Sequence, residues 1–134
     1  VRGPLSIYDN AALTNLDGLG GIISIWQYLS IRFNDSLTNL NGLSGIISVG
    51  EVFTGNLDVE YNSALEEFCG LFPLLSASGL EGQYSVNNNA TNPTEAEILA
   101  GGACFAPAVP SLGPVAIAIL GMLIATAGVR RVRA

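Results

Sequence analysis

The chain has 134 residues, of which 49% are hydrophobic and only 12% are charged, and it contains no histidine. Residues 1–108 carry two arginines against eleven acidic residues, a formal charge of −9, which excludes a nucleic-acid partner because phosphate binding needs a basic face. The missing histidine excludes histidine-dependent serine and cysteine nucleophiles and histidine-ligated metals. The composition therefore predicts no enzyme and no cofactor.

The chain begins with a duplicated unit of 24 residues. The sequence ALTNLDGL at 12–19 returns as SLTNLNGL at 36–43, and GIIS occurs at both 21–24 and 45–48. A third unit follows at a shift of 28 residues, and a degenerate fourth unit starts at Tyr84. Because a unit of this size cannot bury its own apolar side, the repeat predicts stacked units with one shared core.

Each unit opens with alternating apolar residues, as a strand with one buried face does. The alternation turns one set of side chains inward: Leu5, Ile7, Leu29, Ile31, Leu57, Val59, Tyr84 and Val86. An outward column then contains Tyr8, Arg32, Glu60 and Asn87, flanked by Ser6, Ser30, Asp58 and Ser85. Since repeat proteins commonly bind ligands on such a surface, this column is a possible binding face. The alternative is that Arg32 and Glu60 only pair with each other across adjacent turns.

Asparagines at 10, 34, 62 and 89 follow the strands, where stacked amides can hydrogen-bond the backbone of the next turn. Asn34 and Asn89 also fit the N-glycosylation sequon, but their place in the column explains them without sugar. The later apolar positions of each unit step by three between glycines. This spacing favours a coil that turns corners over an α-helix.

Other residues give only weak signals of a functional site. The pairs Glu66/Glu67 and Glu95/Glu97 lack any basic or metal-binding neighbour, so we interpret them as solvated surface. A set of aromatic residues offers a sugar platform or, alternatively, the seal of a small core: Trp26, Tyr28, Phe33 and Tyr61.

The repeated pattern L-x-I-x-x-N-x-x-L-x-x-L-x-x-L resembles the leucine-rich-repeat-like coil of the receptor L domain and its bacterial surface-protein relatives. The resemblance covers roughly residues 5–104, with CGLFPLL and the NPT at 92–94 similar to the end cap of such domains. It implies a right-handed parallel β-solenoid, here of about 3.5 turns, in a mainly β protein. It implies little about function, because related coils bind proteins, sugars or no known ligand.

Cys69 and Cys104 are the two cysteines and bracket the predicted cap. An even count in an exported chain favours a disulfide between them, which would stabilise the chain by about 4 kcal/mol on the loop-entropy estimate. The alternative is two buried free thiols.

Composition changes after Cys104. Residues 105–111 form an Ala/Pro linker, residues 112–129 contain no charge, and residues 130–134 are a basic tail with Arg130, Arg131 and Arg133. Eighteen residues of helix span about 27 Å, which predicts one C-terminal transmembrane helix with a cytoplasmic tail; a buried core helix is the alternative. A GPI signal is disfavoured because such tails normally end apolar.

The order of Pro-containing motif, apolar segment and arginine cluster resembles the C-terminal sorting signals of bacterial surface proteins of the PEP-CTERM class. The motif consists of Val109, Pro110, Ser111, Leu112, Gly113 and Pro114, closest to the Ile-Pro-Thr-Leu variant. The resemblance implies an exosortase-type protease as a partner and the cell surface or membrane of a Gram-negative bacterium as the location.

These features predict an exported surface protein with a binding or structural role, read as the C-terminal part of a longer precursor. Residues 1–104 form its repeat domain with a C-terminal cap. The alternatives are a glycan-binding adhesin domain and the non-catalytic part of a larger surface hydrolase.

Overall fold

A computed structural model describes residues 1–52 and 55–101, which belong to one compact unit, Val1–Cys104. The strands are β1 (Leu5–Tyr8), β2 (Ser24–Ile25), β3 (Leu29–Arg32), β4 (Ser48–Val49), β5 (Leu57–Glu60) and β6 (Tyr84–Asn87). The 3-10 turns are η1 (Asp17–Leu19), η2 (Asn41–Leu43) and η3 (Cys69–Leu71), and the α-helices are α1 (Phe72–Ser76) and α2 (Glu95–Leu99).

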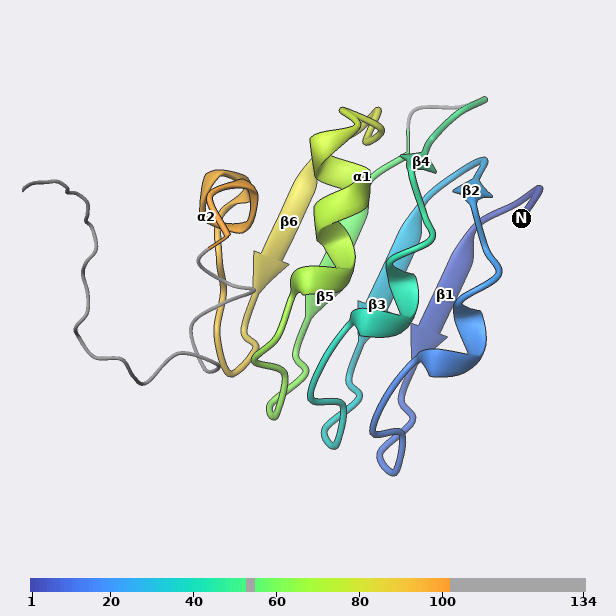
Figure 1. The fold of residues 1–134 in the computed structure, drawn as a ribbon. Coiled ribbons are helices and arrows are strands. Elements are labelled where there is room, and N and C mark those ends of the chain that lie inside the picture. The colour runs from blue at the N-terminus through green and yellow to red at the C-terminus, as the bar shows by residue number, and fades with distance from the viewer. Residues whose placement is uncertain (53–54, 102–134) are drawn as a thin grey trace, which may run out of the picture. The chain divides into compact units, whose positions relative to one another are not determined.

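The units stack with their opening strands in one parallel sheet of order β1-β3-β5-β6 (Figure 1). Leu5 pairs with Leu29, Leu29 with Leu57, and Leu57 with Tyr84, so the register follows the sequence repeat although the shift changes from 24 to 28 to 27 residues. The predicted strands, their register and the degenerate fourth unit are therefore confirmed.

The alternating residues divide as the pattern predicts. In β3 and β5 the leucine, isoleucine and valine side chains are buried, and the residues between them are half-exposed. The core lies between the sheet and the layer of turns and α1 in front of it in Figure 1. Leu37, Leu40 and Leu43 of the second unit are almost fully buried there.

Glycines allow the 3-10 turns of successive units to approach closely. A Cβ on Gly42 would lie 1.9 Å from the carbonyl oxygen of Leu16, and one on Gly70 would lie 1.6 Å from that of Leu40. Both distances are far below any van der Waals contact. Glycine at these two positions is therefore required by the stacking of the units.

The asparagine column forms a continuous ladder. The backbone N–H of Asn10 donates to Asn34 Oδ1 at 3.1 Å, that of Asn34 to Asn62 Oδ1 at 3.0 Å, and that of Asn62 to Asn89 Oδ1 at 3.0 Å. Asn92 ends the ladder, since its Oδ1 accepts the N–H of Asn89 at 2.9 Å. Asn34 and Asn62 are fully buried. The ladder explains the asparagines at both sequons, as the sequence predicted.

The two α-helices follow local signals. Pro73 lies in the first turn of α1, where its missing N–H costs no intrahelical bond. Thr94 and Glu97 form a capping box at the start of α2, with each side chain accepting the backbone N–H of the other. Ile98 of α2 is buried. The helix α1 belongs to the third unit, α2 follows the strand of the fourth, and the two helices contact each other.

The predicted fold class, a right-handed parallel β-solenoid of about 3.5 turns, is wrong. The described residues form two separate parallel sheets, one of four strands and one of two (β2-β4), and they do not close into a solenoid. The glycine-rich corners fold into 3-10 turns whose bonds are local, such as Leu43 N–H to the Leu40 carbonyl at 2.9 Å. Opposite the large sheet, only β2 and β4 pair as strands.

The described residues also contain no helix long and apolar enough to cross a membrane. The helices α1 and α2 have five residues each. The segment 112–129, where the sequence predicted the membrane helix, lies outside the described residues, as do the linker at 105–111 and the tail at 130–134.

Candidate binding surface

The outer face of the four-stranded sheet carries the predicted column in register. Tyr8 pairs with Arg32, Arg32 with Glu60, and Glu60 with Asn87. Because all four point away from the core, they form a row across all four strands. This face is the candidate surface.

Polar side chains on this face hold one another in place. Arg32 Nη2 lies 3.0 Å from Glu60 Oε2 and 3.8 Å from Asp58 Oδ2. Glu60 Oε1 accepts hydrogen bonds from Asn87 Nδ2 at 2.8 Å and Ser85 Oγ at 3.1 Å. The ion pair that the sequence offered as an alternative to binding is therefore present. It lies at the surface with both side chains partly buried, and we expect it to contribute about 1 kcal/mol.

Arg32 is not fully satisfied by these partners. Its Nε atom is buried and has no hydrogen-bond partner. The two carboxylates neutralise its charge, so the face as a whole remains acidic. The network fixes the side-chain positions before any ligand arrives, which lowers the entropic cost of binding.

Three exposed rings, Tyr8, Phe33 and Tyr61, form a row along the carboxyl end of this face, hereafter the aromatic row. Phe33 stacks on Tyr61 with ring centroids 4.9 Å apart and planes at 1°, and Tyr8 meets Phe33 edge-to-face at 5.3 Å. The exposed fractions are 60% for Tyr8, 40% for Phe33 and 45% for Tyr61. Rings that pack on one another while this exposed are a common feature of interaction surfaces.

The backbone under the aromatic row is unusual. Asp9, Phe33, Tyr61 and Asn88 take the same place after successive strands, and each has a φ of 57° or 58°. Asp and Asn tolerate this left-handed conformation, whereas a bulky side chain adopts it at a cost of about 1–3 kcal/mol. The second and third units therefore carry aromatic rings at positions where the first and fourth carry the residues that suit the backbone.

The four aromatic residues that the sequence offered as a sugar platform or a core seal do not come together as one group. Trp26 is half-buried beneath the guanidinium of Arg2, 5.3 Å from the ring centroid. Tyr28 precedes β3, at the opposite end of the strand from Phe33. Within the described residues only Phe33 and Tyr61 of this set meet, and Tyr8 joins them. The residue types predicted aromatic side chains but not their arrangement in a row. Phe33 and Tyr61 come together because positions 9, 33, 61 and 88 are equivalent in successive units.

An open groove lies beside β6, the edge strand of the sheet on the side away from β1. Its volume is about 720 Å³, and it lies between residues 82–86 and residues 92–95. The Tyr84 hydroxyl donates to the Pro93 carbonyl at 2.6 Å. Burial, followed by the nearby carboxylates of Glu95 and Glu97, raises the pKa of Tyr84 well above its ordinary value. This tyrosine therefore stays protonated and anchors the cap.

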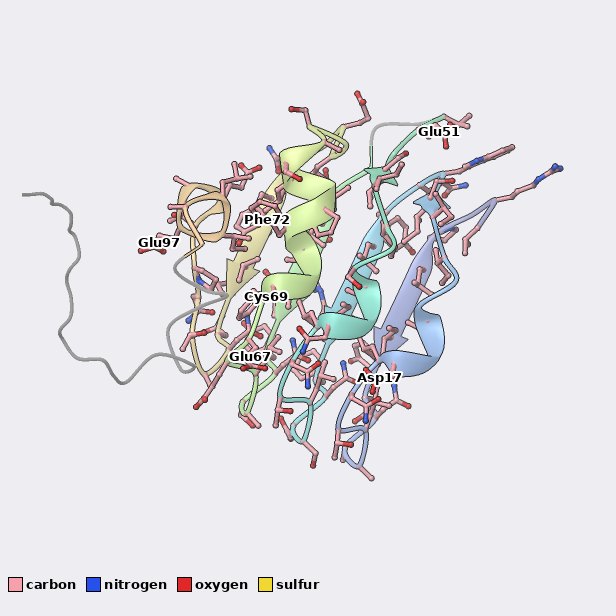
Figure 2. All side chains as sticks on the ribbon, in the orientation of Figure 1. Asp17, Glu51, Glu67, Cys69, Phe72 and Glu97 are labelled. Carbon is pink, nitrogen blue, oxygen red and sulfur yellow. The ribbon has the colours of Figure 1, made fainter. Side chains whose placement is uncertain are left out.

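The acidic pairs lie in different parts of the unit. Glu97 is part of the capping box of α2, whereas Glu67 lies in the segment just before η3 (Figure 2). Residues 1–52 and 55–101 contain no group of His, Cys, Asp or Glu that could hold a metal ion.

Cys69 opens η3 and is disulfide-bonded (Figure 2). Cys104, its predicted partner, lies outside the described residues, so the pairing stays a prediction. The sorting motif at 109–114 and the arginines at 130, 131 and 133 also lie outside them.

Comparison with known proteins adds no relative: no family model matches the chain, and neither the curated proteins nor the solved structures contain a match. The case for a function therefore depends on the geometry of the site.

Proposed function

We propose that this protein is an exported cell-surface binding protein that contacts its ligand through the outer face of the four-stranded sheet. The observation that carries the proposal is the row of Tyr8, Arg32, Glu60 and Asn87, held in register by parallel pairing and preorganised by hydrogen bonds. A sheet built from repeated units offers a flat, rigid surface, which suits recognition of a large ligand.

Two further features support export. A disulfide at Cys69 is typical of an oxidising compartment outside the cytoplasm. The motif at 109–114 and the arginines at 130, 131 and 133 resemble a surface-sorting signal.

A binding screen with two probes tests the proposal: a glycan array and a displayed library of random 12-residue peptides. We expect at least one ligand that the double variant Tyr8→Ala, Arg32→Ala binds at least tenfold more weakly. Ser44→Ala, an exposed change on the opposite layer, is the matched control and keeps wild-type affinity. Circular dichroism of each variant confirms that the fold is retained. A ligand bound equally by the double variant and the control would place binding elsewhere.

A glycan ligand is the second candidate, because exposed aromatic rings commonly stack on sugars. The geometry is less favourable for it. Phe33 and Tyr61 stack face to face, so each of these two rings turns one of its flat faces toward the other ring and away from a sugar. The glycan array decides between the candidates.

A further inference from the structure

The aromatic row offers a contact that the fold itself does not need. Its rings lie outside the core and remain 40–60% exposed. At the equivalent positions, the first and fourth units keep the same backbone with Asp9 and Asn88. Polar residues therefore suffice for the turn, and a bulky ring with positive φ is a local disadvantage at both Phe33 and Tyr61.

The charges around the row define the chemistry of a partner. Asp9 adjoins Phe33 across the first two strands, since its N–H donates to the Arg32 carbonyl at 3.0 Å. Asp35 lies two residues after Phe33 and is exposed, with its Oδ1 accepting only the hydroxyl of Ser63 at 3.1 Å. Arg32, which lies on this face, is already neutralised by Asp58 and Glu60.

We infer that the aromatic row is the contact centre for a protein partner that combines an apolar group with lysine or arginine side chains. The exposed parts of the Tyr8, Phe33 and Tyr61 rings contact the apolar group, and Asp9 and Asp35 pair with the basic side chains. Aromatic residues dominate protein interfaces when polar groups surround them. An acidic partner or an anionic lipid surface is repelled by residues 1–108, which carry eleven acidic residues and two arginines. This inference rests on the proposed binding function and names its partner class.

The test replaces the rings without harming the turn. Asn adopts positive φ readily and is the residue found at position 88, so the double variant Phe33→Asn, Tyr61→Asn keeps the backbone. We expect its melting temperature to equal or exceed that of the wild type. A purely structural row predicts the opposite, a lower melting temperature.

Binding is measured with the displayed random-peptide library, selected on the wild-type chain and counter-selected on the double variant. We expect enriched peptides that carry lysine or arginine beside an apolar residue, and at least tenfold weaker binding of the synthetic peptides to the variant. The charge-reversed peptides, with glutamate in place of the basic residues, serve as controls and should not bind.

Three results would overturn the inference. They are enrichment of acidic peptides, no peptide that distinguishes the wild type from the variant, and a glycan on the array whose binding the variant loses. Peptides or glycans lost with Tyr8→Ala, Arg32→Ala but retained by Phe33→Asn, Tyr61→Asn would refute the row and leave the proposed binding face intact. Absence of any ligand in both screens counts against both proposals.

Discussion

The first two units, residues 5–28 and 29–52, are identical at 14 of 24 positions but have quite different surroundings. Leu37 and Leu43 are buried, whereas their equivalents in the first unit, Leu13 and Leu19, are only partly buried. A Cβ on Gly42 would strike the backbone of the first unit, but nothing in the structure lies within 4 Å of a Cβ on Gly18.

The difference shows that burial in this molecule depends on neighbours and not on the unit itself. Each unit supplies one apolar side, and stacking on both sides buries more of it: in the first unit, which has one neighbour, Leu16 and Ile25 are buried but Leu13 and Leu19 only partly so. Identical residues therefore contribute unequally to the free energy of unfolding. The same substitution made at equivalent positions of the two units measures the difference.

The largest difference is expected at the leucines. Leu37→Ala should lower the free energy of unfolding by about 2–5 kcal/mol, because it leaves a cavity in a closed core. Leu13→Ala should cost about 1–2 kcal/mol, since part of that side chain already contacts water. Urea unfolding followed by circular dichroism measures both, with the half-exposed Ser30 or the exposed Ser44 changed to Ala as a control. Equal losses at Leu13 and Leu37 would contradict the comparison.

Equivalent glycines test the same comparison of the first two units, with a smaller expected effect on stability. Gly42→Ala forces two units apart and should cost about 1–3 kcal/mol or more, as overpacking does. Gly18→Ala occupies the same place in η1 and meets open space, so its effect should stay within about 0.5 kcal/mol. Thermal melts of the two variants, recorded side by side, are sufficient. A stable Gly42→Ala protein would mean that the units stack less tightly than described.

The smallest effect is expected at the capped end. Tyr84→Phe removes the hydrogen bond to Pro93 and should cost about 1 kcal/mol at neutral pH. Because burial raises the pKa of Tyr84, the folded chain keeps a proton that the unfolded chain releases near pH 10, at about the ordinary tyrosine pKa. Wild-type stability should therefore fall as the pH rises above about 10, and the fall should be smaller in Tyr84→Phe. Parallel unfolding curves at pH 8 and pH 11 provide the measurement; an identical fall in both proteins would show that Tyr84 ionises without penalty.

Much of the sheet could be predicted because it repeats. The alternation of Leu29 and Ile31 and the recurrence of Asn34 and Asn62 each have one physical meaning, a buried face and a bonded amide. The far side could not be predicted in the same way. Spacing by three is compatible with a closed coil or with separate 3-10 turns, and backbone torsions decide between them.

The cap and the aromatic row show two other limits of prediction from the sequence. The capping box of Thr94 and Glu97 is readable in the sequence as T-x-x-E and predicts the start of α2, although the repeat pattern draws attention away from it. The row depends on positive φ at Phe33 and Tyr61, and no local signal predicts that conformation for an aromatic residue. The equivalence of Phe33 and Tyr61 is seen in the sequence only when the units are aligned on their asparagines.

The asparagine ladder makes the length of a unit largely irrelevant to its register. Successive rungs are separated by 24, 28 and 27 residues, yet the amide-to-backbone distances stay between 3.0 and 3.1 Å. Each rung resets the alignment, so additional residues between Val49 and Leu57 leave the strand pairing of Leu29 with Leu57 intact. The chain can therefore gain or lose residues on its far side while the outer face keeps the same arrangement of side chains, which gives evolution or a designer a place to vary the molecule without disturbing what it presents.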